Sequence, residues 1–446
     1  MSYRCRICGY HSVKWLGHCP SCGEWDSFGQ DAVDEATESS SSWLGEPLQR
    51  LPEIGAEKVS RFSSGSAELD RLLGGGLVPG AVVLFGGEPG IGKSTLLLQV
   101  ARAVSQRDEV LYVSGEESAA QIKLRASRLG VDSDRVYVLS EQNLRRVAEA
   151  VDTVSPRLLI VDSIQTMRAD SAPGEAGNVR QLREVSAELA RLTKRGNLCT
   201  FLVGHVTKDG GFAGPKVVEH LVDVALYLEG TRGEEVRALR SVKNRFGATN
   251  DVALYQMTSA GLKEIADPSR FFLEEHNAED RAGVAVVPVL EGSRAVLVEV
   301  QALVAPTGGY GVPQRRCTGL DVNRVLLLLA VAERRLGVQL GGADVYLSVA
   351  GGLEARERGV DLAIVAAIMS SLRNKPIEPR TVVTGEIGLS GELRGVRRLK
   401  ERLLEAEKLG YKTAVVPERP APPKGLAIDV RTAADINDAM QLLGLA

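Results

Sequence analysis

The segment Gly87-Glu88-Pro89-Gly90-Ile91-Gly92-Lys93-Ser94, followed by Thr95, constrains this chain more than any other. It has the pattern G-x-x-x-x-G-K-[ST], in which glycines let several backbone N–H groups face one point. Residues 81–85 predict a buried strand before the loop, and residues 94–101 predict a helix opening from it. The positive end of the helix dipole also favours a bound phosphate at this point. The segment therefore predicts a nucleoside triphosphate site, with Lys93 on the β- and γ-phosphates and Ser94 on Mg²⁺.

The composition is that of an ordinary globular protein. The 446 residues predict two or three domains, and 44% of them are hydrophobic. The formal net charge is −3, so contact with nucleic acid would need a local basic patch. No run of about eighteen uncharged apolar residues occurs, so we expect no membrane span. The first residues do not resemble a secretory signal, and we expect a cytoplasmic protein.

Strand and helix patterns alternate over residues 58–270. Apolar runs at residues 109–113, 157–161 and 198–203 predict strands, and stretches such as residues 179–195 predict helices between them. This alternation is typical of a mainly parallel sheet covered on both faces. The sequence predicts an α/β domain whose active groups collect at the carboxyl ends of the strands.

Side chains at these strand ends are the candidate catalytic groups. Asp162 ends one predicted strand and is placed to hold the Mg²⁺ shell through water. Glu116 and Glu117 follow another and offer a carboxylate to orient the attacking water. We favour Glu116 as the residue that orients the water, and Glu117 is the alternative. His205 follows a third strand and is either a sensor of the γ-phosphate or a packed core histidine.

Two glycine-containing loops, residues 168–178 and 207–216, should lie beside the predicted site and are expected to be mobile. Long loops at such a place are usually functional. Cations and one aromatic ring suit the phosphates and a stacked base of single-stranded DNA, although a plain surface loop is the alternative. The candidate DNA-contacting residues are Arg168, Lys208, Phe212 and Lys216.

A predicted hairpin, residues 222–228 and 236–242 around a turn at 231–233, is followed by Lys243-Asn244-Arg245-Phe246-Gly247. We expect the hairpin at the edge of the sheet. There, Lys243 and Arg245 would project away from their own nucleotide and could reach that of a neighbouring subunit.

The first 28 residues contain two Cys-x-x-Cys pairs with ten residues between them. Two such pairs complete a Cys₄ zinc site in a segment too short for a core of its own. The predicted zinc ligands are Cys5, Cys8, Cys19 and Cys22. An acidic, Ser-rich linker is expected to follow at residues 29–57.

The last part of the chain, residues 271–446, predicts a separate α+β domain. Strands are expected at residues 285–290, 295–302, 345–350, 381–386 and 413–417. Helices are expected at residues 321–336, 361–372, 399–409 and 433–442. The predicted partition is therefore a zinc module (1–28), a linker (29–57), an ATPase domain (58–270) and this domain.

Together, the cysteine pairs, the phosphate loop, Lys243-Asn244-Arg245-Phe246-Gly247 and the last domain resemble, in order, the bacterial RadA (Sms) family of recombination and DNA repair proteins. The resemblance covers essentially the whole chain. It implies a RecA-like, DNA-dependent ATPase that forms a homohexameric ring on single-stranded DNA and drives branch migration of recombination intermediates. It also implies that Lys243 and Arg245 act across the subunit interface, and that a recombinase is a possible partner.

The last domain resembles the protease domain of Lon. Residues 385–391 and 399–404 are close to the Lon stretch that carries its catalytic lysine, which falls on Lys400, and Asp361 falls where Lon has its serine. We expect Asp361 to form an ion pair with Lys400 in a non-proteolytic scaffold. Arg315 and Arg316, expected in a loop, are its candidates for DNA contact, and a solvated basic pair is the alternative. The alternatives are a Lon-type protease and a non-motor oligomeric signalling ATPase.

Overall fold

The structure is a computed structural model. It describes residues 3–5, 11–12, 14–15, 17–20, 24–30, 60–205, 214–230, 235–249, 251–274, 281–308, 312–350 and 353–446. The chain forms two compact units, Met1–Lys58 and Val59–Ala446, and each is described by itself.

The first unit contains a small antiparallel sheet with the strand order β2-β1-β3. Its strands are β1 (Tyr3–Cys5), β2 (His11–Ser12) and β3 (Phe28–Gln30). The predicted boundary after residue 28 falls inside β3. Residues 31–57, most of the predicted linker, lie outside the described residues.

The second unit begins with a nine-stranded sheet in the order β12-β11-β10-β9-β4-β8-β7-β5-β6. The six strands from β9 to β6 are mutually parallel, as predicted, and β10, β11 and β12 continue the sheet antiparallel. The strands are β4 (Val82–Gly87), β5 (Val110–Ser114), β6 (Val136–Ser140), β7 (Leu158–Asp162), β8 (Cys199–His205), β9 (Val224–Glu229), β10 (Val236–Asn244), β11 (Val252–Thr258) and β12 (Gly261–Glu264).

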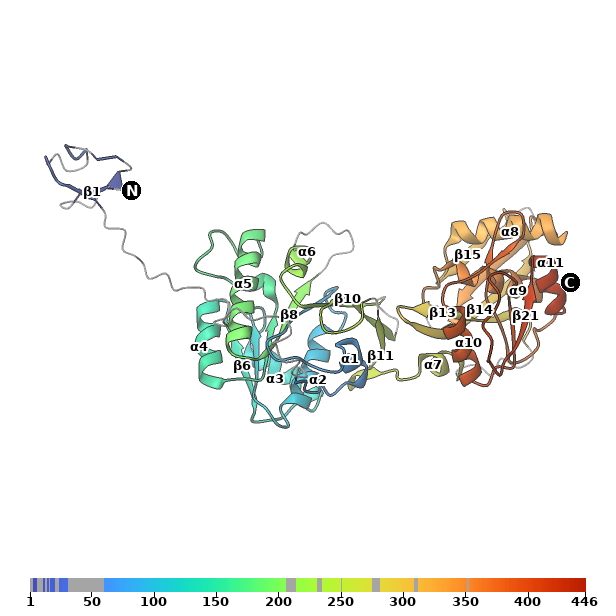
Figure 1. The fold of residues 1–446 in the computed structure, drawn as a ribbon, viewed down its shortest axis with the longest axis horizontal. Coiled ribbons are helices and arrows are strands. Elements are labelled where there is room, and N and C mark those ends of the chain that lie inside the picture. The colour runs from blue at the N-terminus through green and yellow to red at the C-terminus, as the bar shows by residue number, and fades with distance from the viewer. Residues whose placement is uncertain are drawn as a thin grey trace, which may run out of the picture. The chain divides into compact units, whose positions relative to one another are not determined.

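Helices cover both faces of this sheet because successive strand residues point to opposite sides. Phe85 and Ile160 share a core with the helices of one face, and Leu84 and Leu159 share a core with those of the other. The helices of both groups are labelled in Figure 1. The first face carries α1 (Ala67–Leu72), α2 (Lys93–Val104) and α3 (Ala119–Arg128). The second carries α4 (Leu144–Val154), α5 (Val179–Arg195) and α6 (Gly214–Glu219).

The predicted place of the hairpin is wrong. Strands β9 and β10 do pair antiparallel, but they lie inside the sheet, because β11 and β12 add two further strands beyond β10. The prediction stopped the sheet at the hairpin and so missed the strands that cover its outer side.

The C-terminal part contains a mixed seven-stranded sheet in the order β15-β16-β14-β13-β17-β20-β21. Helix α9 is buried along almost its whole length against β13 and β14, as expected for a helix that is apolar all round. The strands of this sheet are β13 (Val284–Glu291), β14 (Arg294–Pro306), β15 (Arg315–Thr318), β16 (Ala343–Val349), β17 (Thr381–Val383), β20 (Thr413–Pro417) and β21 (Asp429–Ala433). Strands β18 (Glu386–Ile387) and β19 (Leu393–Arg394) form a separate two-stranded sheet. The helices are α7 (Pro268–Glu274), α8 (Val322–Leu336), α9 (Asp361–Leu372), α10 (Leu399–Lys408) and α11 (Ile436–Leu442).

Some details here differ from the prediction. Arg315 and Arg316 belong to β15, which pairs parallel with β16, and do not lie in a loop. Ala433 ends β21, and the last helix starts only at Ile436. The predicted boundary after residue 270 falls inside α7, which packs on β14.

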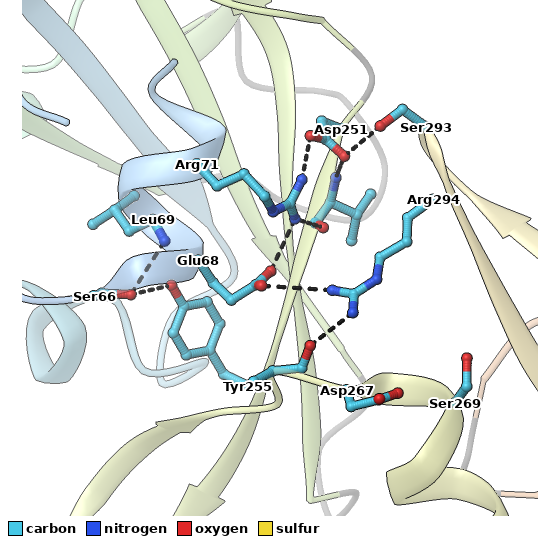
Figure 2. Close-up of polar contacts among 12 residues, drawn as sticks. Ser66, Glu68, Leu69, Arg71, Asp251, Tyr255, Asp267, Ser269, Ser293 and Arg294 are labelled. Atoms are coloured by element: carbon cyan, nitrogen blue, oxygen red, sulfur yellow. Dashed lines mark hydrogen bonds and ion pairs between the residues drawn. The ribbon is translucent and has the colours of Figure 1, made fainter. Parts of the chain in front are cut away.

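A polar cluster joins the nine-stranded sheet to the C-terminal sheet (Figure 2). Arg71 of α1 forms ion pairs with Glu68 and with Asp251, the residue before β11. The Asp251 carboxylate accepts a 2.8 Å hydrogen bond from the Ser293 hydroxyl, and the Glu68 carboxylate lies 3.5 Å from the Arg294 guanidinium. Ser293 and Arg294 stand at the turn between β13 and β14, so this turn is held against α1.

Candidate active site at the phosphate-loop helix

The phosphate loop leads from β4 to α2 with the local geometry that its glycines allow. Gly92 is the N-cap of α2 with a φ of 117°, which favours glycine. A Cβ at this position would lie 2.7 Å from Cε of Met257. No side chain caps the first turn of α2, so its N–H groups can receive an anion. A Cβ at Gly90 would meet no atom within 4 Å, which leaves open space over the loop.

Lys93 lies buried beneath this loop. Its Nζ donates to the carbonyl oxygens of Gly87 (2.8 Å) and Glu88 (2.9 Å), and it lies 3.1 Å from Nδ1 of His205. Burial lowers the pKa of Lys93 to about 8, although Asp162 and Glu116 oppose the shift. Burial and the Lys93 charge also lower the pKa of His205. The ammonium therefore sits in a place that an anionic ligand would stabilise.

Asp162, at the end of β7, faces the start of α2. Its Oδ2 accepts hydrogen bonds from Oγ of Ser94 and from the hydroxyl of Tyr112, each at 2.6 Å. The two predicted magnesium-holding residues thus contact each other directly. Hydroxyl and carboxylate oxygens are the donor set that Mg²⁺ prefers, so these side chains fit the ion.

The two glutamates after β5 have different surroundings. Glu116 Oε1 accepts a 2.6 Å hydrogen bond from Ser163 and lies 3.6 Å from Nε2 of His205. Glu117 forms an ion pair with Arg125 of α3. Both line the same cavity, but only Glu116 belongs to the cluster around Lys93. The cavity has a volume of about 330 Å³, and its lining includes Pro89, Gly90, Gly92, Lys93, Ser94, Thr95, Asp162 and His205.

Lys243 and Arg245 lie at the other end of the sheet. Asn244 is opposite Val224 in β9, and Val224 is opposite Val83 in β4. Gly87, where the phosphate loop begins, is four residues further along β4, or roughly 13 Å at the rise of a strand.

Both cations are engaged within the chain. Lys243 Nζ donates to the carbonyl oxygens of Glu219 (2.7 Å) and His220 (3.3 Å), at the C-terminal end of α6. Arg245, with a side chain that is 60% exposed, lies 3.1 Å from the carboxylate of Asp223. Neither is brought to the phosphate loop of its own chain.

The candidate DNA-contacting residues are scattered. Arg168 is exposed, at the start of a loop that the Gln181 side chain of α5 holds through both backbone groups of Ala169. The Arg315 guanidinium donates to three carbonyl oxygens of its own domain. Arg316 lines a cavity of about 540 Å³. Lys208 and Phe212 lie outside the described residues, as does the side chain of Lys216.

The predicted ion pair between Asp361 and Lys400 is wrong. Asp361 is fully buried and pairs with Arg324 of α8, whose Nε lies 3.0 Å from Oδ1, and it also accepts a bond from the Ile387 amide. Burial raises the pKa of Asp361, although Arg324 opposes this. Lys400 lies on the exposed side of α10, which buries Leu403 instead. A guanidinium fork satisfies a buried carboxylate better than one ammonium does.

The described part of the N-terminal unit includes two of the four predicted zinc ligands. Cys5 of β1 and Cys19 are both buried. Cys8 and Cys22 lie outside the described residues, so the four-sulfur site stays a prediction. Among the described residues no group of three or more potential ligands for a metal forms.

Sequence reasoning did not identify Tyr112 and Ser163 as part of the site. Tyr112 lies within an apolar run that predicts a buried strand. A buried hydroxyl needs a hydrogen-bond partner, so this residue could have indicated a polar group nearby. Ser163 directly follows Asp162, and nothing in its sequence context predicted its bond to Glu116.

A phosphate loop opening a helix beside Asp162 and Glu116, at the carboxyl ends of parallel strands, defines a P-loop ATPase domain. Residues 47–211 match a family described as an AAA domain. Residues 3–30 match a rubredoxin metal binding domain, and residues 345–420 match subunit ChlI of Mg-chelatase.

Curated relatives cover nearly the whole chain. It is 46% identical to the DNA repair protein RadA of Halalkalibacterium halodurans, over 94% of this chain and 92% of that one. It is 48% identical to that of Listeria monocytogenes (93% and 91%) and 44% identical to that of Bacillus subtilis (93% and 91%). The chain belongs to the RadA family, and its last domain is Lon-like.

Among the solved structures that this chain resembles, two cover 46% of it. They are a KaiC-like protein, PH0186, from Pyrococcus horikoshii (21% identity, 99% of that chain, TM-score 0.40) and the RadB recombinase (23%, 99%, TM-score 0.38). At these TM-scores the similarity says nothing about what this chain does. Within the part of the chain that the structure describes, no helix is long and apolar enough to cross a membrane.

Proposed function

We propose that this protein is an ATP-driven motor on single-stranded DNA that acts in homologous recombination and DNA repair and promotes branch migration. The observation that carries the proposal is the convergence of Lys93, Ser94, Asp162 and Glu116 around one cavity. Family membership points to DNA repair, because the relatives bear that name.

In the proposed reaction, each of these groups has one task. The first N–H groups of α2 and the Lys93 ammonium bind the phosphates of ATP. Ser94 and Asp162 would hold Mg²⁺, which neutralises charge on the β- and γ-phosphates. Glu116 accepts a proton from the attacking water, and Ser163 and His205 fix its carboxylate. Glu117, already paired with Arg125, is the less suitable base.

We further propose a homohexameric ring around single-stranded DNA, with Lys243 and Arg245 acting on the nucleotide of a neighbouring subunit. Their place far from their own phosphate loop supports this. Arg168 and Arg316 remain the described candidates for DNA contact. Arg315 is a weaker one, since its donors are used within its domain. The zinc site would hold one ion in the N-terminal unit.

The decisive experiment measures ATP hydrolysis with and without single-stranded DNA, beside a sizing measurement of the same sample. The proposal expects DNA to stimulate hydrolysis and the protein to run as a hexamer. Hydrolysis that DNA leaves unchanged would favour a non-motor ATPase instead. Proteolysis is not expected, because the buried pair of Asp361 and Arg324 offers no nucleophile, and casein degradation would contradict this.

A further inference from the structure

A buried tyrosine reaches the nucleotide site from a position where the fold needs only an apolar ring. Tyr112 lies in the middle of β5 and is fully buried. Its ring belongs to the same core as Leu97 of α2 and Ile160 of β7. Phenylalanine would fill nearly the same volume, so packing does not account for the hydroxyl.

The hydroxyl is accounted for by Asp162. It donates a 2.6 Å hydrogen bond to Oδ2, the oxygen that also accepts the Ser94 hydroxyl at 2.6 Å. A buried hydroxyl without a partner would be unfavourable, and a bond to an ionised carboxylate is about twice as strong as a neutral one. Two donors, one from β5 and one from α2, therefore fix one oxygen of this carboxylate.

The two donors differ in what nucleotide binding demands of them. In the proposed function the Ser94 oxygen binds Mg²⁺, so its bond to Asp162 has to adjust when the ion arrives. Tyr112 is not among the described residues that line the cavity. Its bond to Asp162 can persist through binding and hydrolysis.

We propose that Tyr112 is a positioning residue that holds the Asp162 carboxylate in the orientation required by the Mg²⁺ shell. It acts only through Asp162 and touches neither nucleotide nor ion. The inference rests on the proposed nucleotide site and adds to it a residue that the phosphate-loop pattern does not contain.

The test uses the full chain with Tyr112→Phe, which removes the hydroxyl and keeps the ring. Binding of a fluorescent ATP analogue is measured during a Mg²⁺ titration and again in EDTA. We expect the half-saturating Mg²⁺ concentration to rise about tenfold, a factor that corresponds to roughly 1.4 kcal/mol. Affinity in EDTA should stay unchanged, because the phosphate contacts are intact.

Tyr255→Phe is the matched control. Tyr255 is also fully buried, and its hydroxyl is 2.9 Å from Oγ of Ser66 at the start of α1, in another part of the core (Figure 2). Removing this hydroxyl should leave the Mg²⁺ requirement unchanged. In an Asp162→Ala background, Tyr112→Phe should cause no further change, because the group through which it acts is gone.

Several results would overturn the inference. These are an unchanged Mg²⁺ requirement in Tyr112→Phe, an equal shift in Tyr255→Phe, a shift that survives in the Asp162→Ala background, or weaker binding in EDTA. Unfolding of Tyr112→Phe alone would make the hydroxyl a stabilising group and reject the positioning role. A wild-type protein that binds no nucleotide would contradict the proposed function instead, so the two failures are distinguishable.

Discussion

At the scale of single residues, the partner of each charged group decides what that group can do. Glu116 and Glu117 are neighbours in sequence, yet one bonds to Ser163 beside Lys93 and the other is held by Arg125. A carboxylate that is bonded to a guanidinium is held in place by it and is less free to turn towards an attacking water. The two side chains are therefore expected to differ strongly in their effect on turnover.

We predict that Glu116→Gln binds ATP but hydrolyses it about 10²–10⁴ times more slowly, the usual contribution of a general base. Glu117→Gln should hydrolyse ATP at nearly the wild-type rate. Steady-state hydrolysis and nucleotide binding, measured on both variants, check this. If Glu117→Gln proves the slower variant, the assignment of the base is reversed.

The ion pair of Asp361 and Arg324 leads to a prediction about stability. Arg324→Met would leave the buried Asp361 carboxylate without its cation, which should lower the free energy of unfolding by about 3–5 kcal/mol. Lys400→Met, on the exposed side of α10, should change it by no more than about 0.5 kcal/mol. Urea unfolding of the two variants provides the comparison. Equal destabilisation would mean that Lys400 shares in the pair.

The residues of the site were predictable only where one local pattern carries them. The phosphate loop is such a pattern. Asp162 and Glu116 were predicted because each lies at or just after the end of a predicted strand. The bond from Tyr112 to Asp162 and the pairing of Asp361 with Arg324 were not predictable. Each joins residues far apart in sequence, and only tertiary packing decides which candidate partner comes close enough.

At the scale of elements, the hairpin of β11 and β12 is shared by two cores. Tyr255 and Leu262 pack in the core beside α2, whereas Val252 and Leu254 pack with the C-terminal sheet. The hairpin also contacts the phosphate-loop helix α2 through Gln99. The Gln99 side chain donates to the carbonyl oxygen of Leu262 and accepts from its amide, both at 3.0 Å.

Gln99→Leu should therefore weaken the ATPase core. It keeps the bulk of the side chain but leaves the N–H and C=O of Leu262 without these partners, at roughly 1–3 kcal/mol for each buried group. We expect a lower melting temperature in calorimetry. Gln256→Leu is the control, since this glutamine of β11 bonds only to the exposed Glu235 side chain in the described contacts. Equal melting temperatures of the two variants would show that the bonds between Gln99 and Leu262 do not stabilise the fold.

The zinc prediction belongs to the small sheet of the N-terminal unit. Metal analysis of freshly purified protein should return one zinc per chain, and Cys5→Ser should lose it. Cys317→Ser, which changes a cysteine of β15, should retain it. Because the two compact units are separate, the unfolding transition of Val59–Ala446 should persist in both variants. Purified protein without zinc would contradict the Cys₄ site.

The elements themselves were largely predictable, and their order in the sheet was not. The predicted strands around the phosphate loop lie within a residue or two of β4, β5, β7 and β8, because long apolar runs mark buried strands. Strands β6, β11 and β12 were missed. The place of β9 and β10 inside the sheet depends on those missed strands, so no local pattern could supply it.

At the scale of the whole molecule, the sheet separates the phosphate loop from Lys243 and Arg245. The phosphate loop stands at the carboxyl end of β4, and Lys243 and Arg245 stand near its amino end. A single chain cannot bring the two together without breaking strand pairing. An assembly can, because a neighbour's amino end can face this chain's nucleotide. A cation supplied in this way can contribute about 10³–10⁵ in rate.

We predict that Arg245→Ala binds ATP nearly as well as the wild type but hydrolyses it poorly. Arg240→Ala is a control on β10, the strand that precedes Arg245; its guanidinium pairs with Glu229 and Glu291, and the variant should keep hydrolysis. Lys243→Ala should also lose turnover if this lysine leaves the α6 carbonyl groups to act on a neighbour. If it instead only caps α6, its loss should lower stability and spare turnover.

The interface is tested by mixing two inactive proteins. Lys93→Ala subunits keep an intact Arg245, and Arg245→Ala subunits keep an intact phosphate loop. Some interfaces in a mixed ring therefore pair both intact halves, and we expect hydrolysis to return in part. Mixtures that demonstrably exchange subunits yet stay inactive would mean either that Arg245 does not act across the interface or that the ring needs every site. Titrating each variant into wild-type protein separates these two outcomes, because a ring that needs every site loses activity more steeply than the fraction of variant subunits added.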